Sequence, residues 1–103
     1  MRPQKVPDVL KKVRECLDAG RYCEMPHALQ QMAARKIIPS EVRYVLKHGR
    51  HEPRKDQFSE QHGAWNYAIR GRTLDHDREL RIEVSFDADL LLVITTIALT
   101  QRT

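Results

Sequence analysis

The spacing of apolar residues changes once along this chain, and the change at Gly49 limits the fold more than any other feature. Before Gly49, apolar residues recur every three or four positions, which is the spacing of helices with one buried face. After Gly49, apolar and polar residues alternate, which is the spacing of half-buried strands. Helices followed by strands with short connections predict an α+β fold whose sheet is mostly antiparallel.

Two to three helices are expected before Gly49. Segment 7–20 is a first helix, because Pro7 suits a helix start and Gly20 a helix stop. Segment 26–49 is a helix pair whose members open at Pro26 and Pro39, with Ile37 and Ile38 predicted to form a buried corner between them. The positions expected to face the core are Leu10, Val13, Leu17, Ala28, Leu29, Met32, Ala33, Val42, Val45 and Leu46.

Segment 50–98 is expected to form a three- or four-stranded twisted sheet with the helices packed on one face. Its first strand, Arg50 to Phe58, is polar and contains Pro53, which suits a sheet edge or a partly irregular segment. Three further strands are expected at 65–70, 80–86 and 90–98, with a polar loop over 71–78. The last of them is apolar on both sides, which is typical of a central or covered strand.

A single domain covering residues 1–103 is expected, because this length falls near the common size for one core. Cys16 and Cys23 suggest neither a disulfide framework nor a zinc site. The N-terminus lacks the apolar run of a signal peptide, and no stretch approaches the roughly 20 apolar residues that span a bilayer. We therefore expect a cytoplasmic protein without a membrane segment, cofactor or metal, and the oligomeric state stays open.

Basic residues are concentrated in one part of the chain, whose overall formal charge is +4. Residues 35–55 contain seven basic and two acidic side chains. Such a cluster suits a phosphate-rich partner, although a solvated basic surface gives the same pattern. The candidate nucleic-acid-binding residues are Arg43, Lys47, Arg50, Arg54 and Lys55.

The span from Pro26 to Ala98 resembles a widespread prokaryotic family of small domains of unknown function. The matching stretches are Pro26 to Ala28, Met32 with Arg35, Ile37 to Val42, Val45 to Gly49, Trp65 to Gly71, Leu80 to Phe86 and Leu92 to Thr96. The usual Arg-Gly-Ile step of that family reads Arg35-Lys36-Ile37 here. The family is considered related to the RelE/ParE-like toxins, and Val9 to Gly20 resembles the opening helix of the MqsR-type mRNA interferases. The resemblance thus implies a RelE/ParE-like fold.

The resemblance also implies a toxin-like protein that handles RNA, as a metal-independent endoribonuclease inhibited by a separately encoded antitoxin. Such toxins use the ribose 2′-OH as the nucleophile on its own phosphate. The protein must then supply a base, cations that stabilise the transition state, and an acid. Two alternatives share the fold: a non-catalytic domain that binds protein or nucleic acid, and a ParE-like inhibitor of DNA gyrase. RNA and an antitoxin protein are the expected partners.

The candidate catalytic residues are His27, Arg35, Arg70 and Arg81. His27 is expected at a helix start, beside backbone N–H groups that suit a phosphate; a capping or partly buried structural histidine is the alternative. Arg35 lies eight residues on, or about 12 Å along a helix axis. It can share a face with His27 and bind phosphate, or it can pair with Glu41.

Arg70 and Arg81 are expected to project from neighbouring strands, with Lys55 as a third cation. Two guanidinium groups that converge repel each other unless an anion lies between them, so such a pair indicates a phosphate site. Cross-strand pairing of either arginine with Glu83 is the structural alternative. The other histidines lack the spacing of metal ligands, so no metal site is predicted.

Overall fold

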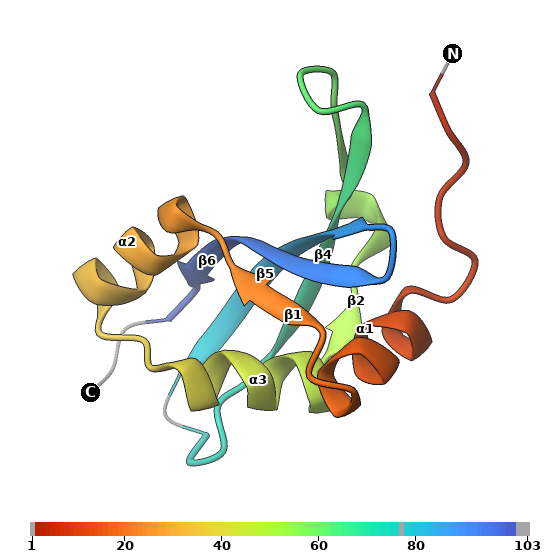
Figure 1. Cartoon of the computed structure of the whole chain (residues 1–103). Coiled ribbons are helices and arrows are strands. Elements are labelled where there is room, and N and C mark those ends of the chain that lie inside the picture. Colours follow the sequence, from red (N-terminus) through yellow and green to blue (C-terminus); the bar gives the residue numbers. More distant parts are fainter. Residues whose placement is uncertain (1, 77, 101–103) are drawn as a thin grey trace.

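The computed structural model describes residues 2–76 and 78–100. Within them, three helices, α1 (Val9–Asp18), α2 (Pro26–Arg35) and α3 (Pro39–His48), precede most of the sheet. The remaining elements are β1 (Tyr22–Glu24), β2 (Arg50–His51), the short 3₁₀ helix η1 (Pro53–Lys55), β3 (Gln57–Ser59), β4 (Ala64–Arg72), β5 (Glu79–Asp87) and β6 (Leu90–Ala98). The strand order is β1-β6-β5-β4-β2, and β3 also pairs with β4 (Figure 1).

The expected α+β class is confirmed, with helices first and a mostly antiparallel sheet after them. The expected strand number is wrong, because the described residues form a six-stranded sheet. One added strand arises in segment 50–58, where Pro53 separates β2 from β3 and η1 lies between them. The other added strand is β1, which connects α1 with α2 and was not predicted.

β1 makes β6 an internal strand of the sheet. It pairs with β6 in parallel, with Tyr22 opposite Leu91 and Glu24 opposite Val93. The pairing is extended beyond β1 by the Met25 N–H, which donates to the Val93 carbonyl at 2.9 Å. β6 therefore has a neighbour on each side along its first half, as its apolar sequence predicted.

The helices cover one face and one side of the sheet. α3 contacts β4 and β5, and α1 contacts α3 and β6, so both lie on the same face (Figure 1). α2 lies instead beside β6, beyond the end of β1. There the Gln31 side-chain oxygen accepts the Thr96 N–H at 2.8 Å, which replaces a missing strand partner. No described helix covers the opposite face, which we call the uncovered face.

The core contains most of the predicted positions; Leu10 is partly buried against it, and the exposed exceptions lie on and after α2. Val13, Val42 and Leu46 are fully buried as expected. Leu29 is 48% exposed and Ala33 is also exposed, because α2 meets only the side of β6 and buries a narrow stripe at Ala28 and Met32. The predicted buried corner is half wrong: Ile37 is buried, whereas Ile38 precedes the first turn of α3 and is 56% exposed.

The helix starts follow the expected proline pattern in two of three cases. α2 and α3 begin at Pro26 and Pro39. α1 begins one residue after Asp8, whose carboxylate accepts the Lys11 N–H at 3.1 Å, so Asp8 rather than Pro7 defines its start. α2 ends at Arg35, and the next residue, Lys36, takes the left-handed conformation (φ 55°) that glycine usually adopts after a helix.

A buried arginine holds the end of α2 against the start of α3. Arg78 is only 3% exposed, and its guanidinium donates to the carbonyls of Arg35 (2.7 Å) and Lys36 (2.8 Å) and to the Glu41 carboxylate (3.0 Å). These bonds satisfy carbonyls that a helix end leaves without intrahelical partners. The loop predicted over 71–78 is thus shorter than expected, and its last residue belongs to the interior.

Two glycines allow the end of α3 to rest on the backbone of β4. A Cβ atom at Gly49 would lie 2.5 Å from the Arg70 carbonyl oxygen, and one at Gly71 would lie 3.0 Å from the Gly49 Cα. No larger residue fits without moving backbone. This close approach sets β2, which starts at Arg50, beside β4.

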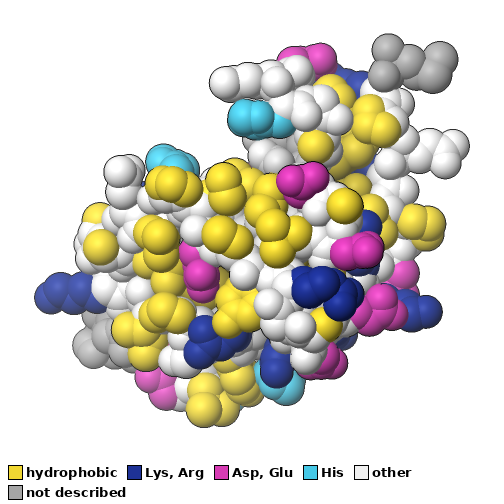
Figure 2. All heavy atoms as spheres, viewed as in Figure 1, with side chains coloured by type: hydrophobic (Ala, Val, Ile, Leu, Met, Phe, Trp, Pro, Cys, Tyr) yellow, Lys and Arg dark blue, Asp and Glu magenta, His cyan; other side chains and the backbone are white. Residues whose placement is uncertain are grey.

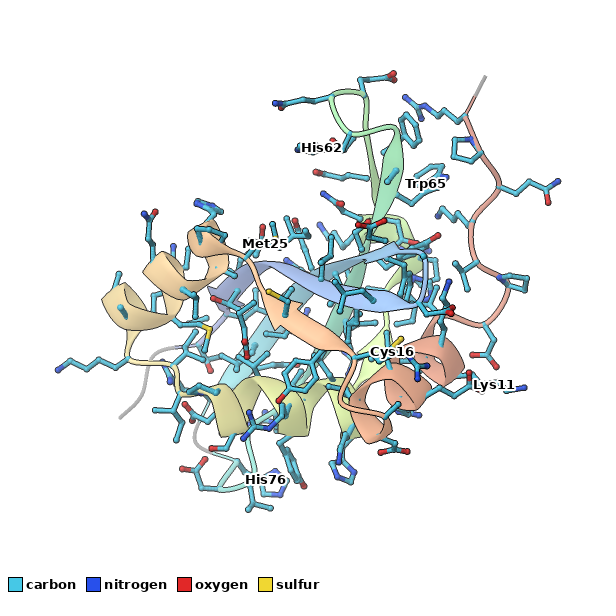
Figure 3. All side chains as sticks on the ribbon, in the orientation of Figure 1. Lys11, Cys16, Met25, His62, Trp65 and His76 are labelled. Atoms are coloured by element: carbon cyan, nitrogen blue, oxygen red, sulfur yellow. The ribbon has the colours of Figure 1, made fainter. Side chains whose placement is uncertain are left out.

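The β3–β4 hairpin projects beyond the rest of the sheet, and the N-terminal segment lies along its helix-side face (Figure 1). The Trp65 Nε1–H donates to the Pro3 carbonyl at 2.8 Å, and the Val6 N–H donates to the Tyr67 hydroxyl at 2.9 Å. Figure 3 shows Trp65 on the side of the hairpin that faces this segment. The other side of the hairpin continues the uncovered face.

Candidate functional site

Strand register places three arginines together on the uncovered face. Tyr67 and Ile69 of β4 point into the core, so their neighbours along the strand point away from it. Arg70 stands opposite Arg81 on β5 and opposite Arg50 on β2. We call Arg50, Arg70 and Arg81 the arginine row. Two predicted catalytic residues and one predicted nucleic-acid-binding residue therefore share one site.

Two glutamates accompany the arginine row. The Arg81 Nε–H donates to Glu52 Oε1 at 2.9 Å, and Arg70 Nη1 lies 3.6 Å from Glu52 Oε2. The Arg70 Nε–H donates to Glu79 Oε1 at 2.7 Å. The anion between the two guanidinium groups is thus the carboxylate of Glu52. We call these five residues the arginine–glutamate cluster.

Both carboxyl groups of the cluster are ionised at neutral pH. The hydrogen bond from Arg81 lowers the pKa of the Glu52 carboxyl, and the hydrogen bond from Arg70 lowers the pKa of the Glu79 carboxyl, in each case against the effect of burial. The bond to Glu79 raises the pKa of Arg70. Three positive and two negative groups result. The side chains of Arg70 and Glu52 are 30% and 18% exposed, so a ligand in solution can reach them.

The irregular segment around Pro53 sets the position of Glu52. The Glu52 N–H donates to the Ala68 carbonyl at 2.8 Å, and the chain then leaves the sheet in η1. The Asp56 carboxylate accepts the Ala68 N–H at 3.0 Å, so a side chain supplies the acceptor that a regular strand would provide. The Asp56 side chain is fully buried and also contacts Lys5 (3.0 Å) and His51 (2.9 Å). This network fixes both ends of the segment that carries Glu52.

The other two predicted catalytic residues lie on α2. His27 is exposed at the second position of the helix, and within the described residues its ring makes no hydrogen bond or ion pair. Arg35 is exposed at the last position, and its carbonyl accepts from Arg78. β6 lies two strand spacings of about 4.8 Å from β4, and α2 lies beside β6, farther still from β4. The fold does not bring either residue against Arg70.

The predicted nucleic-acid-binding residues do not form one surface. Arg43 donates to the Tyr22 hydroxyl at 3.3 Å, and Lys47 lies 3.8 Å from Asp18, so both are on the helix side. Arg54 and Lys55 are exposed on η1, and no hydrogen bond or ion pair between described residues joins Lys55 to the arginine row. Only Arg50 reaches the uncovered face.

Glu83 was the expected cross-strand partner of Arg70 or Arg81, but it pairs with neither. Arg70 pairs with Glu79, and Arg81 pairs with Glu52. Neither glutamate was singled out from the sequence, although a signal existed. Arg50 and Glu52 are two apart in the chain, as are Glu79 and Arg81, so each pair would share a face of a strand. Over the described ranges, no group of three or more His, Cys, Asp or Glu residues is arranged to hold a metal ion.

No helix of the described chain is long and apolar enough to cross a membrane.

The molecule is an α+β domain with helices on one face of its sheet and a charged cluster on the other. Residues 25–98, well over half of the chain, match the family model described as "Domain of unknown function (DUF4258)". The chain belongs to this family, which confirms the expected membership in a family of small domains of unknown function. No curated protein and no solved structure matched the chain significantly.

Proposed function

We propose that the uncovered face binds RNA and that the arginine–glutamate cluster cleaves it without a metal ion, in a toxin-like protein related to the RelE/ParE-like toxins. The observation that supports this proposal is the geometry of Arg70 and Arg81. They stand directly opposite each other on a face without helices, and a single carboxylate lies between them. A phosphate group has the charge and acceptor geometry to take the same place.

The proposed reaction uses three side chains of the cluster. Glu52, ionised at neutral pH, takes the proton of the ribose 2′-OH, and the 2′-oxygen attacks the adjacent phosphorus. Arg70 and Arg81 stabilise the extra negative charge of the phosphorane-like transition state. The bond to the 5′-oxygen breaks, and water supplies the proton for this leaving group. The products are a 2′,3′-cyclic phosphate and a 5′-hydroxyl end.

The test is incubation of the purified protein with a messenger-length RNA in EDTA, followed by mapping of the new ends. Wild-type protein is expected to leave 2′,3′-cyclic or 3′-phosphate ends. Glu52→Gln and Arg81→Ala are expected to cut at least about 100-fold more slowly, as when one charge-stabilising donor is removed from an enzyme. Lys47→Ala is the matched control, because it also removes one positive charge, and Lys47 is exposed on the helix side, where it lies 3.8 Å from Asp18. Intact RNA with every protein would refute cleavage.

A second candidate function is RNA binding without cleavage. It is favoured by the pairing of both guanidinium groups with carboxylates, at 2.7 Å and 2.9 Å, since an arginine held by a glutamate is less available to a transition state. The two candidates differ in Glu52→Gln. Both expect this variant to bind RNA more tightly, because a competing negative charge is gone, but only the catalytic candidate has a cleavage activity to lose. An antitoxin protein that covers the arginine row would inhibit either function.

A further inference from the structure

A hollow of about 250 Å³ lies on the uncovered face, at the hairpin end of the sheet. It forms because β4 pairs with β5 only from Tyr67 onward and pairs with β3 before that. The two strands therefore separate near Trp65, where the Ser85 hydroxyl donates to the Trp65 carbonyl at 2.8 Å. The hairpin projects beyond this point (Figure 1). Its residues His62, Ala64 and Asn66 line one side of the hollow.

The floor of the hollow is apolar. Leu92 and Ile94 of β6 line it together with Met25, and all three are partly exposed. A bulge adjusts β6 here: Glu83 is opposite Thr95 and Val84 is opposite Val93, so Ile94 has no partner on β5. Bulges of this kind re-aim side chains beside functional sites. Figure 2 shows hydrophobic side chains gathered between α2 and the hairpin.

The wall of the hollow carries polar groups without partners in the described structure. The Asn66 amide and the His62 ring both line it, and neither side chain makes a hydrogen bond to another described residue. Figure 3 shows His62 on the side of the hairpin that faces α2. Asp87 also lines the hollow, and its carboxylate repels anions. The fitting ligand is therefore a neutral, flat group with a hydrogen-bonding edge, and not a phosphate.

We propose that this hollow binds one unstacked nucleobase of an RNA strand whose phosphates cross the arginine row. A nucleobase offers apolar faces to Leu92 and Ile94 and a donor-and-acceptor edge to Asn66, which is how single-stranded RNA is read. The hollow is smaller than the about 300 Å³ at which pockets for drug-sized ligands begin, which suits a single base. The inference rests on the proposed function.

The distance between the two sites suits one short strand. Asn66 and Arg70 are four residues apart on β4, which corresponds to about 13 Å. Stacked nucleotides rise by about 3.4 Å each, so one strand reaches from the hollow to the arginine row within about four nucleotides. The charge pattern agrees, because the cations lie at the row and the carboxylate of Asp87 lies at the hollow.

The hollow is tested first with nucleosides, which carry no phosphate. In a methyl-resolved NMR titration with adenosine, guanosine, cytidine and uridine at millimolar concentration, at least one is expected to shift the methyl signals of Leu92 and Ile94. The methyl signals of Val84, buried on the opposite face, are the internal control. If no nucleoside shifts Leu92 or Ile94, the base site is refuted, whatever the arginine row does with RNA. An apolar side chain from a protein partner would then be the better occupant.

A second experiment uses a hexanucleotide and an abasic strand of equal length. Ile94→Glu places a carboxylate in the hollow, and Thr95→Glu adds the same charge on the same face at a residue outside the hollow. Ile94→Glu is expected to weaken binding of the base-bearing strand about tenfold more than Thr95→Glu, within the range for loss of one stacked base. The two variants are expected to bind the abasic strand equally.

Equal affinity of wild-type protein for both strands would overturn the base site and leave backbone binding in place. If neither strand binds, and the nucleoside titration also gives no shift, both the base site and the proposed RNA function fail. If neither strand binds but a nucleoside shifts Ile94, the hollow binds free bases and the RNA proposal alone fails.

Discussion

Replacing Arg78 with alanine is expected to destabilise the fold more than any other single change to a charged residue on the sheet or its loops. The guanidinium makes three hydrogen bonds in a side chain that is 4% exposed, one of them to a carboxylate. Arg78→Ala removes the partner of two helix-end carbonyls and takes one cation away from the Glu41 carboxylate. Breaking one side of a buried ion pair costs about 3–5 kcal/mol. This is a large part of the 5–15 kcal/mol that stabilises a typical domain.

Urea unfolding followed by circular dichroism measures this loss for wild-type protein, Arg78→Ala and the exposed control Arg72→Ala. Arg72→Ala is expected to stay within about 0.5 kcal/mol of wild type, as surface changes do. Arg78→Lys keeps the charge but cannot reach three acceptors with one planar group, so an intermediate loss is expected. A loss below about 1 kcal/mol in Arg78→Ala would show that water replaces the guanidinium. Arg78 would then not be what holds the end of α2 against the start of α3.

Three further perturbations follow from the fold around the cluster. Gly49→Ala places a Cβ atom 2.5 Å from the Arg70 carbonyl oxygen, so thermal unfolding is expected to show a loss of about 2 kcal/mol or more; an unchanged melting temperature would contradict the close approach. Asp56→Ala leaves the Ala68 N–H without its acceptor and is expected to cost about 3 kcal/mol, whereas Asp56→Asn, which keeps an acceptor, should cost less. Because the pKa values of Glu52 and Glu79 are lower in the folded protein, their stabilising contribution is present above the unfolded value near 4.3 and is lost as the pH falls through the folded values. Melting curves between pH 3 and 6 should therefore fall more steeply for wild type than for a Glu52→Gln, Glu79→Gln double variant, and parallel curves would refute this linkage.

The elements that could be predicted are those whose signal is local. α1, α3 and β5 have enough residues for a period of about 3.6 or 2 to be recognised, and β6 has a continuous apolar run; all four lie where these signals placed them. β1 has three residues, too few to show alternation, and its pairing with β6 joins segments about 70 residues apart. No local pattern carries such information. The prediction that Leu29 faces the core is wrong for a related reason. Helical spacing shows which residues share one face of a helix, but not how much of that face the rest of the protein covers.

The site was predictable only in part, because alternation shows which side chains share a face of a strand but not which arginine each glutamate contacts. Arg70 and Arg81 were expected on the polar face of neighbouring strands, and their register opposite each other confirms that position. The two-residue spacing relates Glu52 to Arg50, but its contacts with Arg70 and Arg81 depend on how the chain leaves the sheet at Pro53, which the contact of Asp56 with the Ala68 N–H fixes. Arg78 was read as a loop residue because arginine is seldom buried. Its burial depends on two helix ends that meet only after folding.

The position of Glu52 links the stability of this fold to the occupancy of its site. Like charges placed opposite each other on neighbouring strands destabilise a sheet, so Arg50, Arg70 and Arg81 would oppose the pairing of β2, β4 and β5 by themselves. Glu52 offsets this repulsion from within the row, in the place where a phosphate would also offset it. Removing its charge should therefore lower the stability of the free protein and raise its affinity for RNA. Because the RNA would then replace the missing carboxylate, the stabilisation gained on adding RNA should be larger for Glu52→Gln than for wild type. A variant that lost stability without gaining affinity would show that Glu52 serves the sheet alone.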